Sequence, residues 1–162
     1  MYKILIIVLL SIVSSQYINQ ETGWEFYQSS SQSFYIFEEL EIDGESPTGD
    51  GWAPSLTLNS ECQNNPGTCD VVGAFLDGVC VGWVYADSDG GTTLPIMGYD
   101  DTNNQTQINT QNYCVDGDVP EIKFFDVSNN TVLDVTSGDV LPGWQLNFAH
   151  VIYNISFANN GI

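Results

Sequence analysis

Short runs of β-branched and aromatic residues alternate with turn residues along this chain, and that alternation constrains the fold more than any other feature. The clearest case is the dipeptide Asp77-Gly78, which separates two apolar runs at 71–76 and 79–85. An Asp-Gly loop of two residues has the backbone freedom that a tight hairpin turn requires. We therefore expect these two runs to form an antiparallel hairpin, and none of the runs has the periodicity of a long amphipathic helix.

The remaining runs predict further strands. They lie at 24–27, 34–42, 92–97, 122–127, 131–135 and 144–157. The runs at 122–127 and 131–135 flank Ser128-Asn129-Asn130 and predict a second hairpin. Pro95 indicates a sheet edge or a bulge, because proline cannot donate to a strand ladder. In the last run one face is expected to hold Val151, Tyr153, Ile155 and Phe157, and the other Asn154 and Ser156. Roughly seven to nine short strands in a chain of single-domain length favour an antiparallel β-sandwich, with a closed barrel as the alternative.

The amino-terminal residues 1–15 are predicted to be a secretory signal peptide. Lys3 supplies the positive charge, Ile4 to Val13 the apolar segment, and Ser14 and Ser15 the small residues at the cleavage site. The apolar segment is about half the length of ~20 residues that spans a bilayer. The mature protein is therefore expected to be secreted and extracellular, with residues 16–22 as a free arm ahead of a domain at 23–162.

Positive charge is almost absent once the leader is removed. The chain has 21 acidic residues, no Arg and two Lys, so loss of Lys3 leaves Lys123 alone and a net charge of about −20. Such a protein cannot neutralise a nucleic-acid backbone and is repelled by anionic membranes. His150 is the one histidine, so few side chains could act as a general base. The sequence shows no combination of residues typical of a catalytic site. We expect a protein that is not an enzyme, binds no nucleic acid and inserts into no membrane.

Four cysteines in a secreted chain favour disulfides over a zinc site. Cys62 and Cys69 flank Asn64-Asn65-Pro66-Gly67, a strong turn sequence, and are expected to pair. That pairing leaves Cys80 and Cys114, which would join two predicted strands.

Five segments of the chain resemble a known module when they are taken together. They are 26–37 leading into Ile42-Asp43-Gly44, then 70–75, 78–83, 94–101 and 117–127. In this order, over roughly residues 24–157, they resemble an immunoglobulin-like β-sandwich module of secreted surface proteins, mostly of marine and aquatic bacteria. The resemblance implies an all-β, antiparallel immunoglobulin-like sandwich without catalytic residues; a jelly roll or a partly closed barrel is the alternative. Family members usually sit in long multidomain chains beside adhesion-type or sorting domains. We expect this chain to carry the module alone, with an inserted loop at about 47–69.

Three further kinds of site can be nominated from the sequence. Asp87 and Asp89 lie in an acidic turn that could bind a structural calcium ion; we expect no other cofactor. Trp52 lies in the inserted loop and is the tryptophan that we nominate for stacking on a sugar, whereas Trp83 is expected in the core. N-glycosylation sequons begin at Asn104, Asn129 and Asn154.

These features support two hypotheses of function. The first is a secreted structural protein, a subunit that assembles with itself or with other extracellular proteins into a filament or coat. The arm would supply Tyr17 and Ile18 as a donated strand on the sheet edge of a neighbour. The alternative is a glycan-binding or adhesive module that uses the inserted loop and Trp52.

Overall fold

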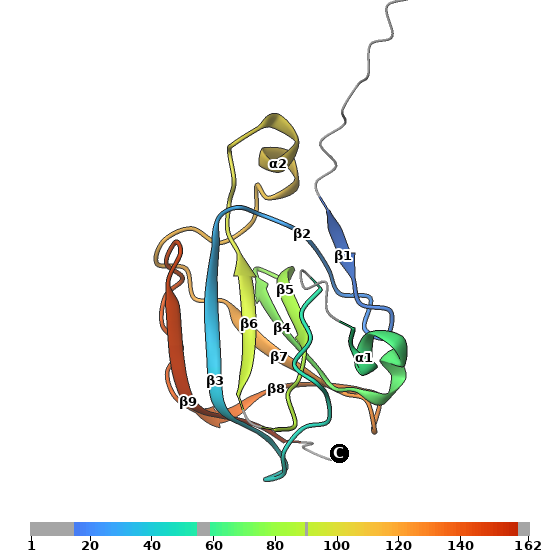
Figure 1. Cartoon of the computed structure of the whole chain (residues 1–162). Coiled ribbons are helices and arrows are strands. Elements are labelled where there is room, and N and C mark those ends of the chain that lie inside the picture. Colours follow the sequence, from blue (N-terminus) through green and yellow to red (C-terminus); the bar gives the residue numbers. More distant parts are fainter. Residues whose placement is uncertain (1–14, 55–58, 90, 159–162) are drawn as a thin grey trace, which may run out of the picture.

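The computed structural model of the chain describes residues 15–54, 59–89 and 91–158, and its strands form two sheets (Figure 1). Most of the predicted leader lies outside the described residues. The small sheet pairs β1 (Gln16–Ile18) with β2 (Glu25–Tyr27). The large sheet has seven strands in the order β5-β4-β7-β8-β9-β3-β6. These are β3 (Gln32–Ile42), β4 (Val71–Leu76), β5 (Val79–Tyr85), β6 (Thr92–Met97), β7 (Glu121–Asp126), β8 (Thr131–Gly138) and β9 (Ala149–Phe157).

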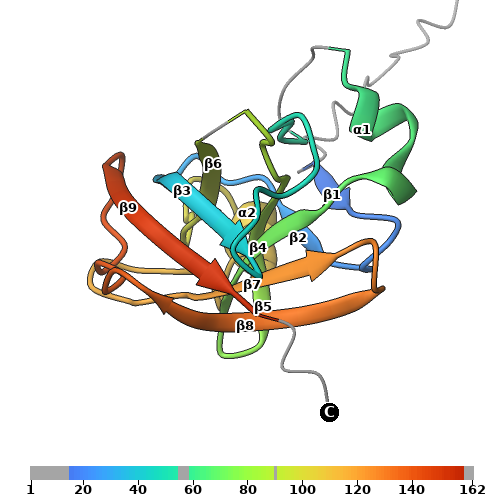
Figure 2. The same cartoon turned by 90° about the horizontal axis from the view of Figure 1, so that it is seen from below.

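The large sheet curls until its two end strands meet, so the molecule is nearly a barrel (Figure 2). Where β5 passes β6 the backbones almost touch: a Cβ built on Gly82 would lie 2.1 Å from the carbonyl oxygen of Pro95. Only glycine permits this approach. The all-β class predicted from the sequence is confirmed, in the sandwich-or-barrel form, but the sheet is not wholly antiparallel because β3 and β9 pair in parallel. β6 is an end strand, as Pro95 indicated.

Both predicted hairpins form. Asp77 and Gly78 have φ angles of 49° and 82°, the two positive values that a two-residue hairpin turn of type I′ needs. β4 and β5 pair on either side of this turn. Asn130, with φ of 51°, turns the chain between β7 and β8. The residues of each turn therefore set the strand register of both hairpins.

The face predicted for the last strand is correct at one end only. Ile155 and Phe157 are buried, but Val151 and Tyr153 are 47% and 64% exposed. β9 runs parallel to β3, and the alternation of buried and exposed residues is interrupted in both strands at neighbouring positions of the sheet. In β3 the interruption is at Glu38 and Glu39, which are consecutive exposed residues. The bend in the curled sheet interrupts the simple alternation that the prediction assumed.

Three short helices occur outside the strands in the part of the chain described here. They are α1 (Glu61–Asn64), the 3-10 helix η1 (Pro66–Thr68) and α2 (Asn104–Asn109). The first two lie in the inserted loop, and a disulfide between Cys62 and Cys69 ties them together as predicted. None of the helices within these ranges is long and apolar enough to cross a bilayer.

The second predicted disulfide is not formed, because Cys80 and Cys114 are buried free thiols. The two residues have different surroundings: the Cys80 thiol donates to the carbonyl of Gly82, whereas Cys114 lies in an isolated bridge beside Gly98. Burial raises the pKa of each thiol to about 12, so both stay protonated and unreactive. Spacing along the sequence could not show that Cys114 lies outside the strands, whereas Cys80 lies in β5.

The arm predicted to be free is folded onto the domain. β1 pairs antiparallel with β2, and Tyr17 packs its ring 5.4 Å from that of Phe26. Asn19 is buried in the connecting turn, where its Oδ1 accepts from the backbone N–H groups of Glu21 and Thr22. The prediction of a free arm is wrong because an Asx-type turn and pairing with β2 hold these residues on the domain. Neither contact is evident from the order of residues along the sequence.

The buried carboxylate of Asp100 is expected to make the stability of the protein sensitive to acid. Asp100 is 2% exposed and accepts four hydrogen bonds from Ser30 and Thr102, at 2.6–2.9 Å. Burial acts to raise the pKa of Asp100, but these hydrogen bonds outweigh it and lower the pKa to about 2.

The stabilisation by Asp100 is therefore present above the unfolded pKa of about 3.9 and is lost as the pH falls towards 2. We expect Asp100→Asn to lower the free energy of unfolding by at most about 2 kcal/mol at neutral pH and to flatten its decline between about pH 4 and pH 2. Urea unfolding across this range measures both effects. An acid slope equal to that of the wild type would contradict the prediction.

Candidate ligand-binding pocket

Two separate segments cover the outer face of β4 and β5, and a pocket lies between them. The β1–β2 hairpin is one cover: a Cβ on Gly73 of β4 would lie 2.7 Å from the ring of Trp24. Gly73 pairs with Trp83 of β5, so Trp83 lies on this same face. The inserted loop with α1 and η1 is the other cover. Figure 1 shows β1 and α1 close together beside the sheet.

The pocket has a volume of about 320 Å³ and a lining of aromatic and amide side chains. Its aromatic residues are Tyr17, Trp52, Trp83 and Tyr85, and its amides are Gln16, Gln20 and Gln63. Ile18, Pro54 and Pro66 complete the described lining, and none of these described residues carries a charge. The residue nominated from the sequence, Trp52, is thus joined by aromatics from β1 and β5.

Trp52 is held by hydrogen bonds that extend the edge of β5. The backbone N–H of Tyr85 donates to the Trp52 carbonyl at 3.0 Å, and Gly51 donates to Ala86 at 2.9 Å. Asp50 secures the same segment from the other side, because its Oδ1 accepts from the Trp52 N–H at 3.1 Å. These bonds hold the backbone of Trp52 in place, and the residue is 8% exposed.

Asp50 also fixes the α1 wall of the pocket. Its Oδ2 accepts from the Ser60 hydroxyl at 2.6 Å and from the Cys62 N–H at 3.3 Å. Ser60 in turn caps α1 by accepting from the Gln63 N–H at 3.0 Å. These bonds and the Cys62–Cys69 disulfide position Gln63 and Pro66 at the rim.

β1 forms the opposite wall. The indole N–H of Trp83 donates to the Tyr17 carbonyl at 3.4 Å. The Trp83 and Tyr85 rings meet edge to face, with centroids 5.6 Å apart. Burial raises the pKa of Tyr85, and the carboxylates of Glu21 and Asp50 add to that rise. The phenol therefore stays neutral and keeps its proton available for donation.

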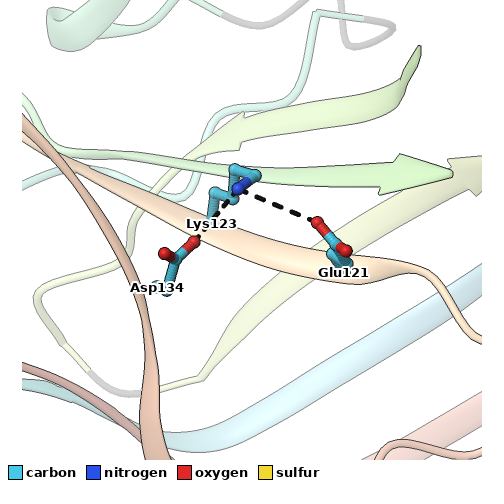
Figure 3. Close-up of polar contacts among 3 residues, drawn as sticks. All are labelled: Glu121, Lys123 and Asp134. Atoms are coloured by element: carbon cyan, nitrogen blue, oxygen red, sulfur yellow. Dashed lines mark hydrogen bonds and ion pairs between the residues drawn. The ribbon is translucent and has the colours of Figure 1, made fainter. Parts of the chain in front are cut away.

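The single lysine outside the predicted leader does not line the pocket. Lys123 on β7 forms ion pairs with Asp134, at 3.0 Å, and with Glu121, at 3.8 Å (Figure 3). Its ammonium group is thus paired with the carboxylates of neighbouring residues on the sheet.

The other residues nominated from the sequence lie elsewhere. Asp87 accepts from the Asp89 N–H at 2.9 Å, and the described residues contain no cluster of three or more His, Cys, Asp or Glu side chains arranged to hold a metal. His150 packs between the rings of Tyr35 and Phe148, at 5.1 and 4.7 Å, and burial lowers its pKa. These positions add nothing to the pocket.

The three sequons differ in their surroundings. Asn104 is exposed at the start of α2. The amide of Asn129 donates to Asp126 at 2.6 Å, and that of Asn154 to Asp139 at 3.4 Å. A glycan at either of the latter two sites would replace one of the two amide hydrogens and leave one N–H to donate.

Sequence reasoning missed most of the pocket. Trp83 was expected in the core, and it is buried, but one part of it faces the pocket. Tyr85 could not be singled out from the sequence as a pocket residue, because it occupies an ordinary buried position in its strand. Comparison of the chain with protein-family models, with curated proteins and with solved structures gave no match.

Proposed function

We propose that this protein is a secreted glycan-binding module and that the pocket between β1 and the inserted loop is its binding site. One observation carries the proposal: four aromatic side chains and three glutamine amides from separate segments converge on one pocket. The C–H face of a pyranose suits the electron-rich face of an aromatic ring. Amides can both donate to and accept from sugar hydroxyls. Concave sites with apolar walls and a few polar groups are typical of small-ligand binding.

The test replaces Trp52 with alanine. We expect the affinity for bound oligosaccharide to fall at least about tenfold, since loss of a stacking aromatic in a binding site costs on the order of 2 kcal/mol. Isothermal titration calorimetry with neutral oligosaccharides, selected on a glycan array, measures the change. Gln20→Ala is a milder second variant on an exposed side chain and should weaken binding a few-fold.

Tyr153→Ala is the matched control, because this aromatic residue is 64% exposed on β9 and does not line the pocket. Its affinity should equal that of the wild type. The proposal fails if no glycan class binds, or if Tyr153→Ala weakens binding as much as Trp52→Ala.

Self-assembly into an extracellular filament or coat is the second candidate, favoured by an apolar strip on the sheet. Val151 and Tyr153 are exposed on β9, and Val151 lies beside Ile36 of β3 in the parallel register. Donation of the arm would first require β1 to leave β2 of its own chain. Because a net charge of about −20 opposes stacking, assembly should grow as salt screens the repulsion. Light scattering that stays at monomer size from low to high salt would exclude this candidate.

A further inference from the structure

The charge around the pocket points to a narrower class of ligand. We propose that the pocket selects glycans that carry a protonated amine, such as hexosamine residues, over their neutral counterparts and against uronic acids. This inference rests on the proposed glycan-binding function and concerns the selectivity of the same site.

A carboxylate stands at the rim of the aromatic pocket. Glu21 follows the lining residue Gln20, and its Oε1 lies 3.8 Å from the place where a Cβ on Gly67 would be. Gly67 belongs to η1, whose Pro66 lines the pocket. The turn holds the backbone of Glu21 in place, because its N–H donates to the buried Asn19 at 3.1 Å. An ammonium group on a bound sugar could therefore pair with Glu21 across the mouth of the site.

A second carboxylate, that of Asp50, acts on the pocket through its electric field. Asp50 already accepts hydrogen bonds from Trp52, Ser60 and Cys62, and these bonds keep the pKa of Asp50 low despite the opposing effect of burial. Asp50 is thus a negative charge that hydrogen bonds hold beside the backbone of Trp52, on a residue that is itself exposed. Burial is the main cause of the raised pKa of Tyr85, and the carboxylates of Glu21 and Asp50 add to it, which is consistent with both lying near this lining residue.

Aromatic faces and carboxylates attract a cation together. A cation over the face of Trp or Tyr is attracted by the ring quadrupole, and no described lining residue carries a positive charge to oppose it. The same arrangement repels an anionic sugar, for which the described lining offers no Arg or Lys partner. Across the whole chain 21 acidic residues add to that preference.

The test compares two oligosaccharides of equal length and linkage, one of glucosamine with free amines and one of N-acetylglucosamine, with oligogalacturonate as the anionic member. Calorimetry is done at low salt and below the pKa of the amine. We expect the free-amine form to bind about fivefold more tightly than the acetylated form, and the uronate not to bind. Glu21→Gln should reduce the preference to about twofold. Glu39→Gln removes the same charge from an exposed position on β3 and should leave the preference unchanged.

The outcomes separate this inference from the proposed function. Equal binding of the amine and acetylated forms, both weakened by Trp52→Ala, overturns the charge selectivity and leaves the glycan site standing. Binding of the amine form that survives Trp52→Ala is attraction of a polycation to the acidic surface, and it overturns the inference. An equal loss of preference in Glu39→Gln and Glu21→Gln overturns it as well. Absence of binding by every oligosaccharide defeats the proposed function itself.

Discussion

Replacement of Gly82 by alanine is expected to lower the free energy of unfolding by about 3 kcal/mol or more, the upper end of overpacking effects. The added methyl group would lie 2.1 Å from the Pro95 carbonyl oxygen, which is backbone and cannot rotate away. β5 and β6 would have to separate at the point where the curled sheet closes. Thermal and urea unfolding, followed by tryptophan fluorescence, measure the loss.

Gly78→Ala is the control for this prediction. Gly78 has a φ of 82°, but no atom of the described residues lies within 4 Å of the place where its Cβ would be. That substitution therefore costs only backbone strain, about 1 kcal/mol. Equal losses for the two variants would mean that contact between β5 and β6 does not limit the stability of the fold.

Deletion of residues 16–22 is expected to remove ligand binding and to destabilise the domain by about 3 kcal/mol. The deletion takes away one wall of the pocket, formed by Gln16, Tyr17 and Ile18. It also uncovers Phe26, which is 1% exposed, and leaves β2 without its partner strand. Loss of burial for one large aromatic residue costs about 1.5–3 kcal/mol, and the lost strand bonds add to that. Calorimetric titration and urea unfolding of the chain beginning at Gly23 measure the two effects.

Point variants locate the cause of that loss. Tyr17→Ala should reproduce much of it, because the ring that packs on Phe26 is lost, whereas the Tyr17 backbone carbonyl that accepts from Trp83 remains. Ile18→Ser should change stability by less than about 0.5 kcal/mol, because Ile18 is 54% exposed. A deleted chain with wild-type stability and affinity would show that β1 is a dispensable arm, as the sequence alone had indicated.

Local chemistry made much of the fold predictable. The strand runs on either side of Asp77-Gly78 and near Asn130 could be placed because a turn that needs positive φ acts within a few residues. The short loop between Cys62 and Cys69 made their disulfide predictable for the same reason. Pro95 marked an edge strand because its missing N–H is a property of the residue itself.

The candidate site was predictable only through Trp52. Its position in a loop outside the strand pattern distinguished it from the other tryptophans, whereas Trp83 and Tyr85 follow an ordinary strand alternation. Nothing in the local sequence shows that the outer face of β5 is covered by two segments that both precede it in the chain. Glu21 likewise gained its place at the rim only when the turn around Asn19 docked against η1.

By itself, then, the sequence determined the all-β class, two hairpins, one disulfide and a strongly acidic surface, because each depends on nearby residues or on composition. Only the tertiary structure decided that Cys80 and Cys114 stay apart, that residues 16–22 pack on the domain, and that the sheet curls until Gly82 meets Pro95. It also decided that Tyr17, Trp52 and Tyr85 share one pocket. Such contacts join residues far apart in the chain, and their geometry depends on how the whole sheet twists and closes.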